Sequence, residues 1–190
     1  MVVSTVNALF NTLYGNVDER VLTAAKKVKL LVCDIDGVFS DGRIYLGNDS
    51  EELKAFNTKD GFGIKALSQN GVAVAVITGR QSNIVNNRMR ALNVQFIVQG
   101  QEDKMPALVD IAQQLDLDID EVAYIGDDVP DLPCIEAVGL GVAVNDAHPL
   151  VVRSADYVTF LKGGHGAVRE LCDLIMQAQG TLHLAKGASV

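Results

Sequence analysis

The stretch KLLVCDIDGVFSDGR, from Lys29 to Arg43, decides the fold of this chain. Its first part, residues 30–33, is an apolar run of the length that is typical of a buried strand. Two carboxylates, Asp34 and Asp36, follow this run directly, and Gly37 comes next. Two unpaired carboxylates at the end of a buried strand repel each other and are costly in free energy. A divalent cation would remove this repulsion, whereas an exposed acidic turn would avoid it, because Asp-Gly is also common in turns.

Apolar runs that predict strands alternate with segments that predict helices over the rest of the chain. Strands are expected at 29–34, 71–80, 95–98, 122–125, 140–144 and 155–159, and helices at 59–70, 81–92, 104–115, 131–137, 148–153 and 166–178. The run 71–80 has no polar alternation, which is typical of a strand buried on both faces of a parallel sheet. The order of elements therefore predicts an α/β fold with a doubly wound, Rossmann-like parallel sheet.

The remaining segments are expected to surround this sheet within a single domain that covers residues 1–190. Residues 1–27 form an N-terminal arm with helical spacing, which Gly15 and Asn16 interrupt and in which Asp18 can cap a second helix. Residues 43–46 and 51–56 have the pattern of two short strands joined by a polar turn, which predicts a β-hairpin flap beside the carboxylate pair. The tail 179–190 is rich in Gly, Ala and Ser and is expected to be flexible.

The composition of the chain excludes some classes of binding partner and indicates the cellular compartment. The formal net charge of the 190 residues is −8, which argues against binding to nucleic acid or to an anionic membrane surface. The three cysteines are scattered and never form a Cys-x-x-Cys pair, which indicates reduced thiols in a cytoplasmic protein. The start of the chain has no signal-peptide pattern, and no apolar run approaches the ~20 residues that a membrane span needs.

Three of the expected strands end in polar or charged side chains. Asp34 and Asp36 end the first, Thr78 ends the second, and Asp127 and Asp128 follow the strand 122–125. Ligands of a doubly wound sheet bind at the carboxyl ends of its strands, so these groups should meet at one edge. Such an all-oxygen site suits Mg²⁺ or another hard divalent ion. A zinc site is disfavoured because the chain has no close Cys pair and no His-Glu-x-x-His.

Carboxylates gathered around such an ion can transfer a phosphoryl group. One carboxylate can attack phosphorus and form an aspartyl-phosphate, while the ion offsets its repulsion from the anionic phosphoryl group. A second carboxylate can protonate the leaving alkoxide and later deprotonate water. The hydroxyl of Thr78 and the ammonium of Lys104, which begins an expected helix, can hold the phosphoryl oxygens.

Four short motifs, in this order, resemble those of the haloacid dehalogenase-like phosphotransferases: Asp34-x-Asp36-Gly-Val, Thr78-Gly-Arg, Lys104 and Gly126-Asp127-Asp128-x-x-Asp131. The resemblance spans about residues 28–160. It implies that Asp34 is the nucleophile and that Asp36 is the acid and base. It further implies that Thr78 and Lys104 complete the catalytic set.

The same resemblance implies a metal site and an open architecture. The metal ligands would be the Asp34 carboxylate, the Asp36 backbone carbonyl and Asp127, with Asp128 and Asp131 behind them. Members of this family often carry a cap domain inserted after the first or third motif, whereas only a hairpin-sized insert follows the first motif here. The chain is therefore expected to have no cap domain, so that a neighbouring subunit could close the site against water.

Longer stretches are similar to the family of 3-deoxy-D-manno-octulosonate 8-phosphate phosphatases over nearly the whole chain: GVFSDG at 37–42, FNTKDGFGIK at 56–65, ITGR at 77–80 and GGHGAVRE at 163–170. This likeness implies a Mg²⁺-dependent homotetramer that hydrolyses a sugar acid phosphate in lipopolysaccharide biosynthesis. It also implies that the substrate is bound by Asp36, Asn57, Thr58, Lys59, Asp60, Gly61, Lys65, Gly79, Arg80, Arg88 and Lys104. Arg is common in the family at positions 59 and 65, and Lys offers a point charge instead of a bidentate fork.

Three alternatives stay open. A phosphatase for a nine-carbon, sialic-type sugar acid phosphate would use the same chemistry. A phospho-acceptor receiver domain also uses an acidic cluster, a Thr and a Lys on a doubly wound sheet. However, its Lys strand comes near the end, whereas Lys104 precedes Asp127 here. A catalytically silent scaffold is disfavoured because every motif carboxylate is present.

Overall fold

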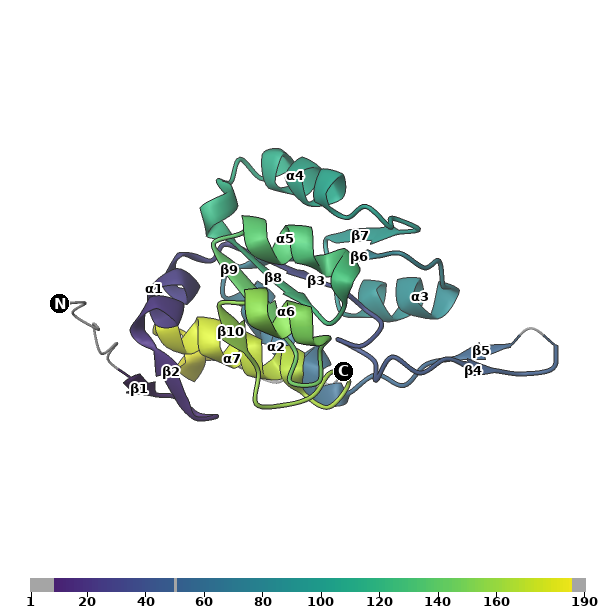
Figure 1. Cartoon of the computed structure of the whole chain (residues 1–190), viewed down its shortest axis with the longest axis horizontal. Coiled ribbons are helices and arrows are strands. Elements are labelled where there is room, and N and C mark those ends of the chain that lie inside the picture. Colours follow the sequence, from purple (N-terminus) through teal and green to yellow (C-terminus); the bar gives the residue numbers. More distant parts are fainter. Residues whose placement is uncertain (1–8, 50, 186–190) are drawn as a thin grey trace.

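The computed structural model describes residues 9–49 and 51–185, and a six-stranded parallel sheet lies at its centre (Figure 1). The order across the sheet is β10 (Tyr157–Val158), β9 (Leu140–Ala143), β8 (Val122–Gly126), β3 (Leu30–Cys33), β6 (Ala73–Thr78) and β7 (Phe96–Gln99). In β3, Leu31 is paired with Val74 of β6 on one side and with Ala123 of β8 on the other. The chain thus builds the sheet outward from β3 in one direction and then in the other. This confirms the predicted doubly wound fold.

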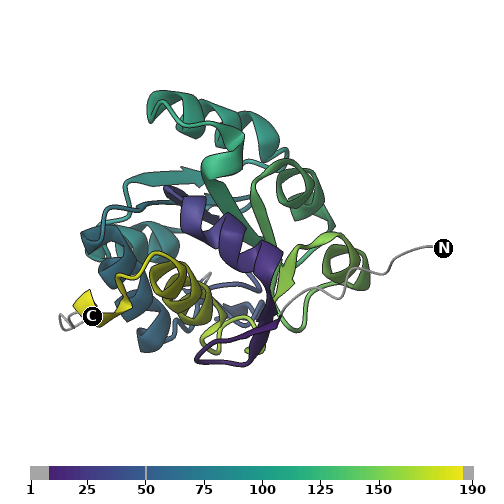
Figure 2. The same cartoon turned by 90° about the vertical axis from the view of Figure 1, so that its left-hand side faces the viewer.

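Helices cover both faces of the sheet, because successive side chains of each strand point to opposite sides. Leu31 and Cys33 face the layer of α1 (Glu19–Lys27), α2 (Thr58–Gln69), α3 (Asn83–Ala91) and α7 (Ala167–Ala178). Leu30 and Val32 face the layer of α4 (Met105–Gln114), α5 (Leu132–Ala137) and α6 (Pro149–Ser154). All four side chains are fully buried, which explains why the strand has no polar position. In Figure 2, α1 and α7 lie side by side over one face.

The N-terminal arm differs from its prediction in one part. Residues 9–18, where helical spacing was expected, form a two-stranded antiparallel hairpin of β1 (Leu9–Asn11) and β2 (Asn16–Asp18). The turn between them is closed by Thr12, whose backbone N–H and hydroxyl both donate to the carbonyl of Gly15, at 2.8 and 2.7 Å. Asp18 caps α1 as predicted, since its carboxylate accepts the N–H of Arg20 at 2.8 Å. The first eight residues of the arm lie outside the described residues.

The predicted flap is a hairpin of β4 (Tyr45–Leu46) and β5 (Glu52–Leu53), which extends away from the body of the protein (Figure 1). Among the described residues, these two strands are the only helices or strands between β3 and α2. Residues 105–121 hold α4 and the 3₁₀ turn η1 (Ile119–Glu121), so no cap domain stands there either. Two further 3₁₀ turns are η2 (Val129–Asp131) and η3 (Leu182–Leu184), and the tail beyond residue 185 is outside the described residues. Among the described residues, no helix has the length and apolar content to cross a membrane.

Candidate active site at the carboxyl end of the sheet

The carboxyl ends of β3, β6 and β8 meet at one pocket with a volume of about 490 Å³. The pocket is lined by Asp34, Asp36, Gly42, Thr78, Gly79, Arg80, Glu102, Lys104, Asp127, Asp128, Pro130 and Asp131. Every residue that the sequence analysis placed in the catalytic or metal set is among them. The switch in strand order at β3 is what brings these distant parts of the chain together.

Three carboxylates form the acidic centre of this pocket. Asp34, Asp127 and Asp131 each offer an oxygen, and these oxygens all lie within 4.8 Å of one another. Asp34 follows β3 and is only 6% exposed, while Asp127 follows β8. Burial, followed by the charge of Asp131, raises the pKa of Asp34. Burial, followed by the charge of Asp34, also raises the pKa of Asp127. The described residues therefore fit a hard divalent cation, whose charge would relieve both effects.

Lys104 is the buried cation of this centre. It precedes α4, is 5% exposed, and donates to Asp34 Oδ1 at 2.7 Å and to Asp131 Oδ1 at 2.6 Å. Burial alone would lower the pKa of Lys104, but the two carboxylates outweigh it and raise the pKa. Lys104 therefore stays charged, and it holds the Asp34 carboxylate in one orientation.

Asp131 has a different place from the other two carboxylates, because protein donors occupy both of its oxygens. Oδ1 accepts from Lys104 and from the hydroxyl of Tyr124, which lies 2.7 Å away. Oδ2 accepts the backbone N–H groups of Asp127 and Asp128, at 3.0 and 3.2 Å. These bonds leave Asp131 little capacity to coordinate an ion. They suit a residue that positions Lys104 and the loop of Asp127.

Gly37 allows Asp127 to reach this centre. Its φ is +92°, and a Cβ atom at this position would lie 2.1 Å from Asp127 Oδ2. Only glycine meets both conditions, since a side chain would be strained there and would also collide with the carboxylate. The Gly in the Asp-x-Asp-Gly motif is therefore a requirement of the acidic centre as well as of the turn.

We expect Gly37→Ala to lower kcat/KM by about 10- to 100-fold, because the methyl group would displace the Asp127 carboxylate from the acidic centre. Gly71→Ala is the matched control: φ is +90° there as well, but no atom lies within 4 Å of the added Cβ. Both variants should lose similar stability in thermal unfolding, while only Gly37→Ala loses turnover and needs more Mg²⁺ for half-maximal rate. Parental turnover and Mg²⁺ dependence in folded Gly37→Ala would contradict this role of Gly37.

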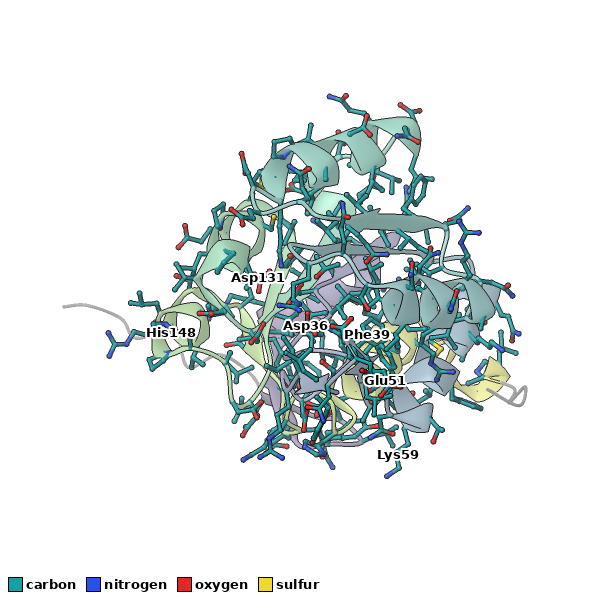
Figure 3. All side chains as sticks on the ribbon, turned by 90° about the vertical axis from the view of Figure 1, so that its right-hand side faces the viewer. Asp36, Phe39, Glu51, Lys59, Asp131 and His148 are labelled. Carbon is teal, nitrogen blue, oxygen red and sulfur yellow. The ribbon has the colours of Figure 1, made fainter. Side chains whose placement is uncertain are left out.

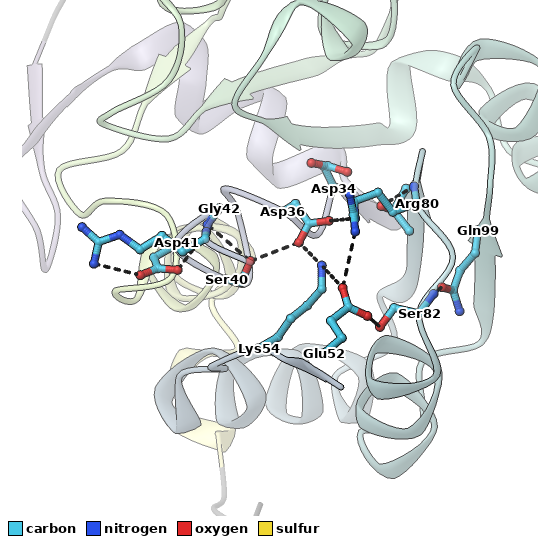
Figure 4. Close-up of polar contacts among 12 residues, drawn as sticks. Asp34, Asp36, Ser40, Asp41, Gly42, Glu52, Lys54, Arg80, Ser82 and Gln99 are labelled. Carbon is cyan, nitrogen blue, oxygen red and sulfur yellow. Dashed lines mark hydrogen bonds and ion pairs between the residues drawn. The ribbon is translucent and has the colours of Figure 1, made fainter. Parts of the chain in front are cut away.

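Asp36 lies at the edge of the pocket and is held by the flap (Figure 4). Its Oδ1 accepts a charged hydrogen bond from Lys54 and also faces the hydroxyl of Ser40 at 3.4 Å. Glu52 of β5 lies beside Lys54, with 3.8 Å between its Oε1 and the ammonium. Glu52 and Lys54 were not predicted at this site.

Thr78 and Arg80 reach the pocket from the end of β6. Thr78 is 2% exposed, and its hydroxyl accepts the backbone N–H of Arg80 at 3.4 Å. The side chain of Arg80 is about half exposed, and its guanidinium points toward Asp36 and Glu52. Thr78, which is expected in the catalytic set, lines the pocket together with Gly79 and Arg80, which are expected to contact the substrate.

The other residues expected to bind substrate lie outside the lining of this pocket. Asn57 caps α2 by accepting the N–H of Lys59 at 2.9 Å, and Lys59 projects from the edge of the molecule in Figure 3, whereas Asp36 and Asp131 lie near its centre. Thr58 begins α2, and Lys65 lies further along it. Gly61 lies against Arg88 of α3, since a Cβ on Gly61 would be 2.6 Å from the Arg88 Nη2 atom.

Among the residues expected to bind substrate, Asp60 has a side chain that the structure places away from the pocket. It is fully buried, and its Oδ1 accepts the backbone N–H of Arg169 at 2.8 Å in the first turn of α7. Burial raises the pKa of Asp60 to about 6. The carboxylate therefore joins α2 to the start of α7 and does not face the pocket.

Comparisons with known proteins agree with this geometry. The family model described as haloacid dehalogenase-like hydrolase matches residues 95–171. The 3-deoxy-D-manno-octulosonate 8-phosphate phosphatase of Salmonella typhi is 49% identical over 187 residues, which cover 98% of this chain and 100% of the relative.

Solved structures of the same family of phosphatases are also similar to this chain. The 3-deoxy-D-manno-octulosonate 8-phosphate phosphatase of Yersinia pestis superposes with a TM-score of 0.95 at 49% identity, over 97% of this chain and 100% of that one. The enzyme of Moraxella catarrhalis, solved with a magnesium ion, a phosphate ion and a KDO molecule, has a TM-score of 0.85 at 41% identity. That match covers 86% of this chain and 94% of the other.

Proposed function

The chain belongs to the 3-deoxy-D-manno-octulosonate 8-phosphate phosphatase family of the haloacid dehalogenase-like hydrolases, and on this basis we propose how its pocket works. It is a Mg²⁺-dependent phosphoric monoester hydrolase that converts 3-deoxy-D-manno-octulosonate 8-phosphate to the free sugar acid and phosphate. This reaction serves lipopolysaccharide biosynthesis. The observation that carries the proposal is the meeting of Asp34, Asp127 and Lys104 in one pocket at the carboxyl end of the sheet.

The residues act in two half-reactions. The Asp34 carboxylate attacks phosphorus, the bond from phosphorus to the sugar oxygen breaks, and Asp36 donates a proton to the leaving alkoxide. In the second half-reaction Asp36 takes a proton from a water molecule, which attacks phosphorus and frees the Asp34 carboxylate. Lys104 and the hydroxyl of Thr78 hold the phosphoryl oxygens throughout.

Mg²⁺ would be held by the carboxylates of Asp34 and Asp127 and by the backbone carbonyl of Asp36. Bound there, it supplies positive charge that offsets the repulsion between the nucleophile and the phosphoryl group. Asp128 and Asp131 lie behind these ligands. Asp131 accepts hydrogen bonds from the Lys104 ammonium and from the backbone N–H groups of residues 127 and 128, which supports that placement.

The sugar acid is recognised beyond the phosphoryl site. Arg80 lies at the pocket and is half exposed, so it can turn its guanidinium toward a carboxylate or hydroxyl of the sugar. Further along we assign substrate contacts to the start of α2 and the neighbouring face of α3, with Asn57, Thr58, Lys59, Gly61, Lys65 and Arg88. Asp60 takes part only through the placement of α2, because its carboxylate is buried against α7.

Phosphate release from a panel of sugar phosphates tests this assignment. With Mg²⁺, kcat/KM should be highest for 3-deoxy-D-manno-octulosonate 8-phosphate and lower for a nine-carbon sialic-type sugar acid phosphate and for neutral hexose phosphates. A preference for the nine-carbon substrate would contradict the proposed substrate but not the proposed phosphatase reaction. Release from no member of the panel would contradict the proposed function as a whole.

We place the enzyme in the cytoplasm as a homotetramer. The described cysteines are all free and buried, which is usual in a reducing compartment. The flap extends from the body and carries exposed apolar side chains, with Leu46 74% exposed and Leu53 65% exposed. A second copy packed on the flap would cover these side chains and help to close a pocket that has no cap.

We expect Leu46→Asp to weaken the assembly, since it places a charge at the most exposed apolar position of the flap. Sedimentation velocity should show smaller species than the parent at the same concentration, with turnover lowered in parallel. Leu9→Asp is the matched control, because Leu9 is 67% exposed on the other hairpin, β1–β2. A parent that sediments as a fully active monomer would refute the proposed assembly.

A further inference from the structure

Lys54 is a buried cation that the two half-reactions do not use. It follows β5 on the flap, and its side chain is only 1% exposed. Burying an ammonium group is costly unless carboxylates pair with it. Lys54 has two such partners: it donates to Asp36 Oδ1 and lies 3.8 Å from Glu52 Oε1. Its position is therefore set by the acid and base of the reaction and by its own strand.

Arg80 completes a ring of alternating charges with these residues (Figure 4). Its Nε lies 3.9 Å from Asp36 Oδ2, and its Nη2 lies 3.6 Å from Glu52 Oε1. The two cations differ in exposure, since the Arg80 side chain is 51% exposed and that of Lys54 is 1% exposed. Lys54 is thus the fixed cation of the ring, whereas Arg80 faces the pocket and can move toward a substrate. Glu52 offsets part of the positive charge of Lys54, and the effect of Lys54 on Asp36 is therefore smaller than that of an unpaired ammonium group.

The two oxygens of Asp36 have different surroundings. Oδ1 accepts from Lys54 and faces the Ser40 hydroxyl at 3.4 Å. Oδ2 is buried, and within the described part of the chain it has no hydrogen-bond partner. A carboxylate held through one oxygen has a defined orientation, and its second oxygen remains able to carry a proton.

We propose that Lys54 is a positioning residue, which holds Asp36 through Oδ1 so that Oδ2 exchanges the proton with the leaving group. The inference rests on the proposed function. In the first half-reaction a bond forms between Asp34 and phosphorus, and the bond from phosphorus to the sugar oxygen breaks. The proton on Asp36 Oδ2 passes to that sugar oxygen, and in the second half-reaction Oδ2 takes a proton back from water. Lys54 itself gives up no proton and does not contact the phosphoryl group.

The dependence of kcat/KM on the leaving group distinguishes a positioning role of Lys54 from a merely structural one. A sugar alkoxide needs a proton as it departs, whereas p-nitrophenolate leaves as a stable anion. The constant kcat/KM reports the steps up to formation of the phosphoenzyme, where the leaving group departs. We expect Lys54→Met to lower kcat/KM for 3-deoxy-D-manno-octulosonate 8-phosphate about 10- to 100-fold more than for p-nitrophenyl phosphate. The ratio of the two constants, measured on one preparation, does not depend on how much of the protein is folded.

Three further variants make the test decisive. Lys54→Arg keeps a cationic donor, so its ratio should lie closer to that of the parent. Lys54→Met combined with Glu52→Gln removes opposite charges together and should show the same selective loss if the single variant does not fold. Lys29→Met is the control, because it removes another lysine–carboxylate pair, that of Lys29 with Glu121 at the opposite end of β3. The Lys29 side chain is 60% exposed, so its loss should leave the ratio of the two kcat/KM values unchanged.

Equal losses with both substrates, or no loss in either, would overturn the role of Lys54 and leave the phosphatase assignment standing. A parent enzyme that hydrolyses neither substrate would overturn the assignment, and the role of Lys54 with it. The two failures are therefore distinguishable in one experiment.

Discussion

Asp34→Asn abolishes phosphate release in our account, with kcat lowered by at least about 10³-fold. The amide is a poor nucleophile, so no aspartyl-phosphate can form. The substitution keeps the shape of a side chain that is 6% exposed and already in contact with Lys104, and it removes one of three crowded carboxylates. The loss should therefore appear in catalysis and not in folding.

A continuous phosphate assay with saturating Mg²⁺, together with thermal unfolding, measures both properties of Asp34→Asn. Asp110→Asn is the control, because it makes the same chemical change on an exposed face of α4, where the carboxylate accepts a hydrogen bond from Gln114. It should retain parental turnover. Folded Asp34→Asn with turnover within tenfold of the parent would show that Asp34 is not the nucleophile.

Removal of divalent cations should have an effect of similar size. After chelation and dialysis we expect turnover to fall by at least about 10²-fold, since the proposed nucleophile Asp34 then lies beside Asp127 and Asp131 with Lys104 as its positive partner. Added Mg²⁺ should restore turnover. Mg²⁺ should also raise the melting temperature, because an ion present at 100 times its Kd stabilises the folded state by about 2.7 kcal/mol.

The variant Asp127→Asn separates the effect of Mg²⁺ binding on the melting temperature from other effects of added salt. Asp127→Asn should lose most of the Mg²⁺-dependent rise in melting temperature, whereas Asp110→Asn should keep it. Full turnover in the presence of chelator, or an equal thermal response in both variants, would contradict the metal site.

The sheet could be predicted because its strands β3, β8 and β9 are buried along their whole length. Leu31 packs in the core on one face of the sheet and Val32 in the core on the other, so the apolar runs are long and lack alternation. The meeting of the predicted site residues in one pocket could be predicted because parallel strands deliver their carboxyl ends to one edge. Asp34, Thr78 and Asp127 therefore converge whatever the loops between them do.

The errors and omissions have a common physical origin in short elements and tertiary contacts. Residues 9–11 have helical spacing, but a turn closed by Thr12 and Gly15 pairs them with β2. Asp60 belongs to a motif associated with substrate binding, yet the start of α7 takes its carboxylate. The contact of Lys54 with Asp36 was not predicted, because the two-residue strand before Lys54 gives too little pattern to show which side chains are buried.

The central claim is that one carboxylate of a metal-holding acidic centre becomes covalently phosphorylated, and rapid acid quench tests it most directly. The parent, mixed with substrate and Mg²⁺ for milliseconds and then denatured in acid, should carry one acid-stable, base-labile phosphoryl group. Peptide mass spectrometry after borohydride reduction should place it at Asp34. A quenched enzyme that releases product but never carries phosphate at Asp34, or that carries it on another residue, would contradict the account.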